Sequence, residues 1–521
     1  MAERGCAGVY FFRIKPPPTS PKKGRRRKKE VHNMFKKILI FSFFPLVAHA
    51  QSTALEEHTN FWQEIARDSR QNPALHGVAF SSSFSQLDVE VDWQRQSEAF
   101  VLEKGSGFLL PSACVDSYLR LSDQTAVWGH ASYMNGRQHG ISWNSTSDFD
   151  LLKPYVLADT LGGDTQRERY RFEGGYATQL NRWLLGAEML FRADHEYRDI
   201  DPRMRGVVND LTLRVGAGYE KWNYRWAMAF EGNIYKQQNN VEFYRELGVI
   251  PEYQMTGLGT EYARFSGDKR SLHYDGGGVI LLFDAEPTQK SGFFGHLELG
   301  KRHYRRLVTE NYTLPLTELY VQGVKAELGV RSQNKAIFVD FDYTKRSGDE
   351  HIVGTSATSS FPDLGVLTMY HNHRLTTSLT ALYGKSFWNV LVRAGYKSDR
   401  ERYAYPERRL ETAHAFGEVS GEAFLKPSER WLLTCRLKSS YSACVSDDLA
   451  MPFADMKPAF VAMIRHNYDF AKAHYTDVSA QVRGDFALKN SGLFAELGGG
   501  FVHCSAGERQ VSAKVAVGVT F

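Results

Sequence analysis

Two pairs of residues have the types and spacing that metal binding or nucleophilic catalysis would need. His371 and His373 in YHNHR are two residues apart, so on a strand they share a face and could hold one metal ion. Two ligands are too few for a structural zinc site, and the sequence offers no convincing third. His503 and Cys504 are adjacent, and adjacent strand residues point to opposite faces, so they do not meet directly. Polar lumen or rim positions account for the histidine pair better than a metal does, and His503 with Cys504 does not form a catalytic pair.

Other motifs for enzyme chemistry are equally weak. Asp340 and Asp342 share one strand face as an acid/base pair would, but carboxylates also line polar barrels. The nucleophile elbow G-x-S-x-G is missing from the sequence. DGGGV at 275–279 lacks the Gly-Lys-Ser/Thr of a phosphate loop. We therefore expect no catalytic residue, no metal ligand and no cofactor, and a hydrolase is the least favoured alternative.

The strands that would carry these residues alternate between apolar and polar positions. NDLTLRVGAGYE, NYRWAMAFEGNIY, AIFVDFDY, WNVLVRAGY and YTDVSAQVRGDF all do so, with aromatic residues toward the ends of the apolar faces. Such segments run to roughly ten residues, which suits a tilted strand that crosses a bilayer. Every backbone group in lipid must be paired, so the sheet has to close. The pattern predicts an all-β fold, a transmembrane barrel with lipid outside and a polar lumen.

Short and long connections alternate between these segments along the chain. Tight links such as LNRW at 180–183 and KNSG at 489–492 alternate with long ones such as 135–168 and 445–458. We count about fifteen strands from residue 169 onward, a hairpin upstream, and one or two more strands within 78–109. Because single-chain barrels favour even numbers, we predict an antiparallel up-and-down barrel of about 16 strands (range about 14–18). Short turns would be periplasmic and long loops extracellular.

The residues on the polar faces of the predicted strands are expected to line the lumen. Their mixed signs favour ion-pair networks across the lumen that narrow or fill it, since a selective pore would carry a ring of one sign. Glycine-rich faces, as at Gly216 and Gly218, fit strand bending or close packing of something inside. The predicted lumen residues are Arg214, Arg225, Glu231, Asp340, Asp342, Arg393, Asp477, Arg483 and Asp485.

The N-terminal region predicts export. MFKKILIFSFFPLVAHAQS, beginning at Met34, has a basic start, a short apolar core and an A-x-A site at Ala48 and Ala50, so the mature chain would begin at Gln51. We interpret 1–33 as a basic upstream extension, 34–50 as the signal peptide, 51–77 as a short periplasmic or lumenal segment, and 78–521 as the barrel. Without 1–50 the net charge of +5 becomes about −5, which argues against nucleic-acid binding. Of the remaining cysteines, only Cys444 and Cys504 could pair, and free thiols are the simpler expectation.

The last residues, VSAKVAVGVTF, place Val515, Val517, Val519 and Phe521 on one face. A signal peptide, amphipathic strands and this aromatic ending resemble Gram-negative outer-membrane β-barrels. In that class the last strand is the assembly signal, which implies the barrel assembly machinery and periplasmic chaperones as partners, together with outer-membrane lipid. Stretches such as RYRFEGGYATQLNRWLLGAEMLFRADHEYRDIDPR resemble a family of uncharacterised outer-membrane barrels. NPAL at 72–75 is similar to an element of long-chain fatty-acid transport barrels, and Pro73 would otherwise mark a plain turn.

Three functions follow from this interpretation. We favour a channel or transporter for small solutes in the bacterial outer membrane. A transporter of lipids or hydrophobic compounds is the first alternative, and a surface or assembly barrel whose loops bind an unknown partner is the second. A TonB-dependent receptor is disfavoured, because a plug domain and about twenty-two strands exceed this length.

Overall fold

The computed structural model describes residues 51–62, 71–244, 252–262, 272–309, 313–354, 362–385, 387–454, 457–489 and 491–521. The expected extension 1–33 and the expected signal peptide 34–50, with Ala48 and Ala50, lie outside these residues. Helix α2 (Gln51–Thr59) begins at Gln51. Within the described ranges, no helix has the length and apolar character needed to cross a membrane.

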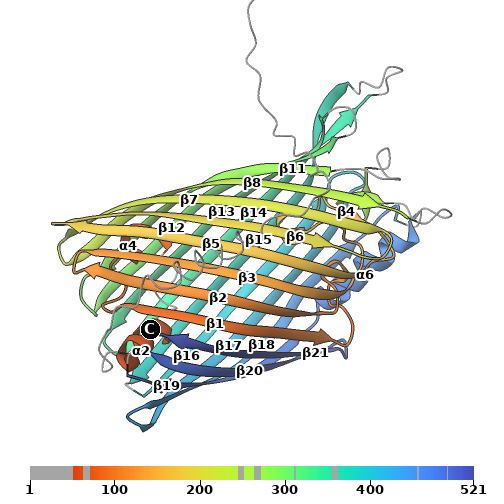
Figure 1. Ribbon diagram of the computed structural model, residues 1–521. Helices are drawn as coiled ribbons and strands as arrows, with labels where there is room; N and C mark the ends of the chain where they lie inside the picture. Colours follow the sequence, from red (N-terminus) through yellow and green to blue (C-terminus); the bar gives the residue numbers. More distant parts are fainter. Residues whose placement is uncertain are drawn as a thin grey trace, which may run out of the picture. The chain divides into compact units, whose positions relative to one another are not determined.

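Eighteen antiparallel strands form one closed sheet, in which each strand pairs with the next along the chain and β21 pairs with β1 (Figure 1). The first nine are β1 (Phe84–Gln96), β2 (Gly107–Ser122), β3 (Thr125–Ile141), β5 (Gly163–Leu180), β6 (Trp183–Tyr197), β7 (Arg203–Lys221), β8 (Tyr224–Glu242), β11 (Leu272–Pro287) and β12 (Gly292–Thr309). The others are β13 (Thr313–Ser332), β14 (Lys335–Val353), β15 (Asp363–Lys385), β16 (Trp388–Tyr403), β17 (Arg408–Ser428), β18 (Trp431–Ala450), β19 (Tyr475–Ala487), β20 (Gly492–Cys504) and β21 (Arg509–Thr520). The predicted closed up-and-down barrel is confirmed.

The preferred number of about sixteen strands is wrong, because the barrel has eighteen, the upper limit of the predicted range. Fifteen strands run from β5 onward, as counted from the sequence, and three full strands precede them. The predicted upstream hairpin is β2 and β3, and the further strand predicted within 78–109 is β1. The individual segments therefore add up to eighteen, and the lower even number was the wrong choice.

The two ends of the barrel differ in how the strands connect. At the end we name the turn end, two- or four-residue turns join the strands, as between β7 and β8. There Trp222 and Asn223 both have positive φ, 56° and 62°, as the favoured hairpin turn requires. At the opposite end, the loop end, the connections include the long segments 142–162, 243–271 and 451–474.

The outer wall of the barrel is apolar. Outward side chains such as Leu213, Val215 and Phe230 are exposed because the sheet puts alternate residues outside. Aromatic pairs lie at both borders of this apolar wall. Trp183 and Tyr219 (4.9 Å between ring centroids) and Trp431 and Phe486 (5.0 Å) lie at the turn end. Tyr133 and Tyr170 (4.9 Å) lie near the middle of β3 and β5, where the outer face becomes polar toward the loop end. A closed barrel with an apolar outer belt and aromatic edges is the architecture of outer-membrane proteins.

The closing seam joins the two ends of the sheet. β1 pairs with β21 from Gln86 opposite Thr520 to Gln96 opposite Gln510. Phe521 continues this pairing, because its N–H donates to the Ser85 carbonyl (2.9 Å) and its carbonyl accepts from the Ser85 N–H (3.2 Å). No edge strand is left in the sheet, as a barrel in lipid requires.

Candidate functional site

All nine predicted lumen residues lie on the inner face of the wall, and several form ion pairs. Arg214 on β7 contacts Glu231 of β8 (2.7 Å) and Glu188 of β6 (3.0 Å). Arg225 contacts Glu220 (2.9 Å), Arg393 contacts Asp340 (3.7 Å) and Arg483 contacts Asp485 (2.9 Å). Asp342 and Asp477 face the lumen without a described ion pair. These bridges link residues on the same or nearby strands, so the predicted bridging across the lumen is wrong for this set, because strand register brings wall residues together.

One ion-pair network does connect the wall to a segment inside the barrel. The carboxylate of Asp194 on β6 forms ion pairs with Arg167 (2.6 Å), Arg169 (2.9 Å) and Arg192 (3.1 Å). Arg192 also contacts Asp148, 2.7 Å away in the segment 142–162. The network therefore fixes this loop-end segment to the inner wall.

The N-terminal segment enters the turn end of the lumen. The Phe61 N–H donates to the Glu422 carboxylate (3.0 Å), and the Trp62 indole N–H donates to Asn389 (3.1 Å). Arg436 on β18 also contacts Glu422 (2.7 Å), so this buried carboxylate is fully engaged. Phe61 packs against a cluster from four strands, formed by Phe294, Ala336, Phe338, Leu382 and Leu391.

The same N-terminal segment also docks on the wall through the NPAL element, next to β5 to β8 and β11. Asn72 caps the short helix α4 (Pro73–His76) by accepting from the Ala74 N–H (3.1 Å), and it donates to Asp284 of β11 (3.0 Å). Asp284 also contacts His296 of β12 (2.6 Å). A Cβ on Gly216 would lie 2.3 Å from the Asn72 Oδ1, so only glycine permits this approach. The glycine-rich inner face thus accommodates a packed segment, as its composition indicated.

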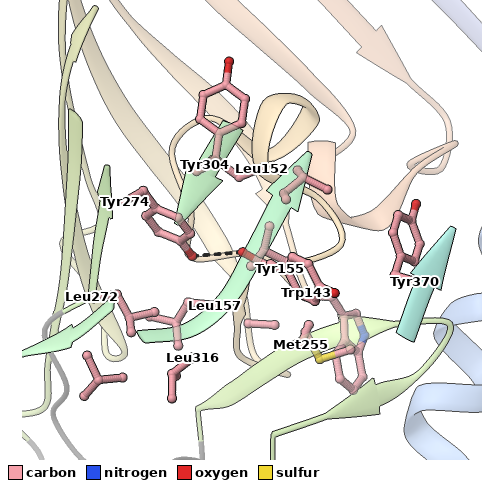
Figure 2. Close-up of a cluster of buried hydrophobic side chains, with 14 of the residues drawn as sticks. Trp143, Leu152, Tyr155, Leu157, Met255, Leu272, Tyr274, Tyr304, Leu316 and Tyr370 are labelled. Carbon is pink, nitrogen blue, oxygen red and sulfur yellow. Dashed lines mark hydrogen bonds between the residues drawn. The ribbon is translucent and has the colours of Figure 1, made fainter. Parts of the chain in front are cut away.

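A second packed unit closes the loop end, and we name it the loop-end plug. It comprises segment 142–162, with helix α5 (Phe149–Leu152), the inner sheet of β4 (Leu157–Ala158), β9 (Tyr253–Gly257) and β10 (Thr260–Glu261), and helix α6 (Pro458–Ala471). Its core packs on lumen-facing wall residues, among them Tyr274, Tyr304 and Tyr370 (Figure 2). Tyr274 donates to the Tyr155 carbonyl (3.2 Å), the bond drawn in Figure 2.

Buried arginines anchor the plug to the wall. Arg306 of β12 donates to the Met255 carbonyl of β9 (2.9 Å), and Arg408 of β17 donates to the Leu258 carbonyl (2.8 Å). Each guanidinium donates to a backbone carbonyl of β9 or of the turn that follows it, so these buried carbonyls are hydrogen-bonded to the wall. The plug is therefore attached to the wall by polar bonds at several points and by its apolar core.

One acidic side chain of the plug lacks such a partner. Glu252 is buried, and within the described part of the chain neither of its carboxylate oxygens has a hydrogen bond. Burial raises the pKa of Glu252 well above its usual range, and the nearby Asp159 raises it further, while Arg198 opposes both. Arg198 is already paired with Asp159 at 2.8 Å. The geometry therefore favours the protonated form of Glu252.

Polar cavities lie between the N-terminal segment and the plug, on the β15–β21 side of the lumen. One of about 570 Å³ is lined by Phe61, Arg393, Glu418, Arg436, Lys438 and Lys514, among others. Another of about 320 Å³ is lined by Arg374, Lys397, Asp399, His414 and, from α6, Ala471. Arg393 and Lys397 are on one face of β16, so a single strand borders both cavities. The lumen thus holds polar space, bordered by the N-terminal segment on one side and by helix α6 of the plug on the other.

The plug is the feature that the sequence interpretation missed. Helix α6 had a signal, because Phe460, Met463 and Ile464 recur at helical spacing after Pro458 and are buried. The inner sheet had none, since β4 and β10 are only two residues long. His371 and His373 lie on the outer wall and do not face the lumen. Cys114, Cys435, Cys444 and Cys504 are free, and in the described ranges no group of three potential ligands could hold a metal.

Comparisons with known proteins give a family. The sequence profile of a family of unknown function (DUF6850) matches residues 73–521. No curated protein sequence matches the chain. The predicted resemblance to an uncharacterised family is confirmed, and the likeness of NPAL to fatty-acid transport barrels receives no support.

Solved structures with a similar barrel include siderophore receptors of Acinetobacter baumannii. The ferric preacinetobactin receptor BauA has 8% identity and a TM-score of 0.40, covering 85% of this chain and 80% of that one. The receptor PiuA has 7% identity and a TM-score of 0.38, covering 85% and 82%. These values are too low to assign a ligand or a mechanism to this chain.

Proposed function

The chain belongs to this family of unknown function, DUF6850, and we propose that it is a gated transporter for small polar solutes in the Gram-negative outer membrane. The observation that carries the proposal is the polar space, lined in part by charged side chains, between the N-terminal segment and the plug. Apolar cargo is disfavoured, because charged Arg, Lys, Glu and Asp side chains are among the residues that line the two cavities. Charge pairs of both signs along the walls favour hydrated solutes over one sign of ion.

Passage would require that both coverings move. The N-terminal segment is held by Asn72, Phe61 and Trp62, and the plug by Arg306, Arg408 and Asp148. Both are short segments attached to a wall that is closed without them. The barrel can therefore stay intact while either covering opens. In this proposal the loop end faces outward and the turn end faces the periplasm, as in outer-membrane barrels generally.

Solute flux tests this proposal. We would reconstitute three forms in liposomes: the mature chain, a form with the plug segments 145–158, 252–262 and 458–471 each replaced by a Gly-Ser linker, and that form also lacking 51–83. Heat-modifiable migration on a detergent gel checks that each form is a folded barrel. We expect low flux of arabinose and lysine for the mature chain, and higher flux for each successive form. A folded but impermeable doubly altered barrel would overturn transport.

The covered lumen also favours one other function. A barrel whose loop end is packed shut offers a rigid surface for an external partner, and transport would then be unnecessary. The flux experiment separates the two functions, because a barrel that only binds a partner has no need of a solute path beneath its coverings. Impermeability of the doubly altered form is the result that this second function expects.

A further inference from the structure

Strand register places basic side chains in rows on the outer wall, on β12 to β16. Lys301 lies opposite Gln322, Gln322 opposite Lys345, Lys345 opposite His373, and His373 opposite Arg400. Two residues farther toward the loop end, His371 lies opposite Arg402. Directly opposed residues have Cβ atoms about 4.5–5.5 Å apart. We name Lys345, His371, His373, Arg400 and Arg402 the outer basic patch.

The patch begins where the apolar belt ends. The row next to it toward the turn end runs Leu299, Val324, Tyr343, Leu375 and Ser398. Tyr343 donates to or accepts from His373 (2.7 Å), so an aromatic residue of the belt edge touches the patch. A hollow of about 530 Å³ spans this border, with Tyr343, Leu375 and Tyr396 on its apolar side and the histidines and arginines on the other. The hollow therefore lies at headgroup level in a bilayer.

The patch carries more positive than negative charge. Glu411 of β17 contacts Arg402 (2.8 Å) and Arg400 (3.9 Å), so one carboxylate serves two guanidinium groups. Both arginine side chains stay largely exposed, at 59% and 62%. Lys345 has no carboxylate partner in the described ranges. An anion at the hollow would complete the pairing.

We propose that the outer basic patch binds the phosphate-bearing headgroup of a lipid in the surrounding leaflet. Guanidinium groups bind phosphate through paired N–H donors, and Lys345 adds a point charge beside them. The apolar side of the hollow takes the start of an acyl chain against Leu375 and Tyr396. A soluble phosphate ion would contact only the basic side of the hollow. Because the hollow also has an apolar side, we favour a lipid over a free phosphate.

Native mass spectrometry of the purified chain tests this inference, with dioleoylphosphatidic acid and dioleoylphosphatidylcholine supplied in equal amounts. We expect phosphatidic acid to be retained in excess. Each cation removed in Arg400→Gln/Arg402→Gln should lower its affinity about fivefold. Arg203→Gln/Arg205→Gln is the matched control, because these arginines also lie on the outer wall at the loop end, and Arg203 is likewise paired with a carboxylate, Asp201 at 3.1 Å.

Two more variants distinguish lipid binding from a purely structural role of these ion pairs. Glu411→Gln should increase retention of phosphatidic acid, whereas a purely structural ion pair predicts no increase. Lys345→Gln/His371→Gln provides a second test pair should the arginine variant fail the heat-modifiability check. Equal retention of both lipids, equal loss in the control variant, or full displacement by inorganic phosphate would each overturn the proposal. None of these outcomes depends on solute flux.

Discussion

The carboxylate of Asp148 lies 2.7 Å from the guanidinium of Arg192 and joins the loop-end plug to the barrel wall. Arg192 also contacts Asp210 of β7 at 3.0 Å and Asp194 at 3.1 Å. Removing Asp148 therefore leaves the arginine paired on the wall, while the plug loses one of its attachments to the wall. Of the three carboxylates around Arg192, only Asp148 belongs to the plug.

We predict that Asp148→Ala loosens the plug and leaves the barrel folded. Losing hydrogen bonds to a charged group should lower the free energy of local opening by about 2 kcal/mol. Hydrogen–deuterium exchange of the segment 142–162 should accelerate accordingly. Asp210→Ala is the matched control, because it removes an Arg192 contact within the wall. Equal acceleration in both variants would show that Asp148 does not tether the plug.

Gly216→Val should displace the N-terminal segment from the turn end. Its new Cβ would lie 2.3 Å from Asn72 Oδ1, which breaks the cap of α4 and the bond to Asp284. We expect loss of about 1–3 kcal/mol of docking free energy, seen as faster proteolysis within 51–83. Gly323→Val is the control, because that inner-wall glycine has no atom within 4 Å of a built Cβ. Unchanged proteolysis in Gly216→Val would contradict this docking.

The wall could be predicted because each strand separates two solvents. Val515 and Val517 face lipid and Lys514 faces the lumen, so polarity alternates with the pleat. The same alternation allowed us to predict which residues face the lumen. The ion-pair partners of these residues could not be predicted, because the register between neighbouring strands determines that Arg214 contacts Glu231 and Glu188.

The plug could not be predicted in the same way. Leu157 and Ala158 are both fully buried, so the strand they form has no polar face and no alternation. Its pairing partners in β9 are about a hundred residues away in the chain, at Tyr253 and Gln254. In the sequence, Arg306 and Arg408 cannot be told from other cations on the inner face of the barrel. Only the structure shows that they bind the carbonyls of Met255 and Leu258 in the plug.

Acidity should affect the plug through Glu252. Its pKa in the fold lies above the value of about 4.3 for an exposed Glu, because burial and Asp159 favour the neutral acid. The fold therefore gains stability from protonated Glu252 at low pH, and loses it as the pH rises from about 4.3 through the raised pKa. We expect protease resistance of the plug to fall over this interval.

Glu252→Gln should remove that pH dependence and raise protease resistance at neutral pH. Glu261→Gln is the control, since Glu261 of β10 is paired with Lys457 and its loss should weaken the plug. A Glu252→Gln variant that keeps the original pH profile would assign the dependence to another group.

Phe521 should matter more for assembly than for the stability of the finished barrel. Its backbone already pairs with Ser85, and Phe521→Ala retains both of those bonds. Its side chain lies on the outer wall and is 46% exposed. The variant should therefore change the free energy of unfolding by less than about 1 kcal/mol.

If the side chain is part of the assembly signal, the amount of heat-modifiable barrel in cells should fall several-fold. Leu425→Ala, which removes an equally exposed apolar side chain from the outer wall of β17, should not cause that fall. Equal yields of the two variants would show that Phe521 acts only as one more lipid-facing residue.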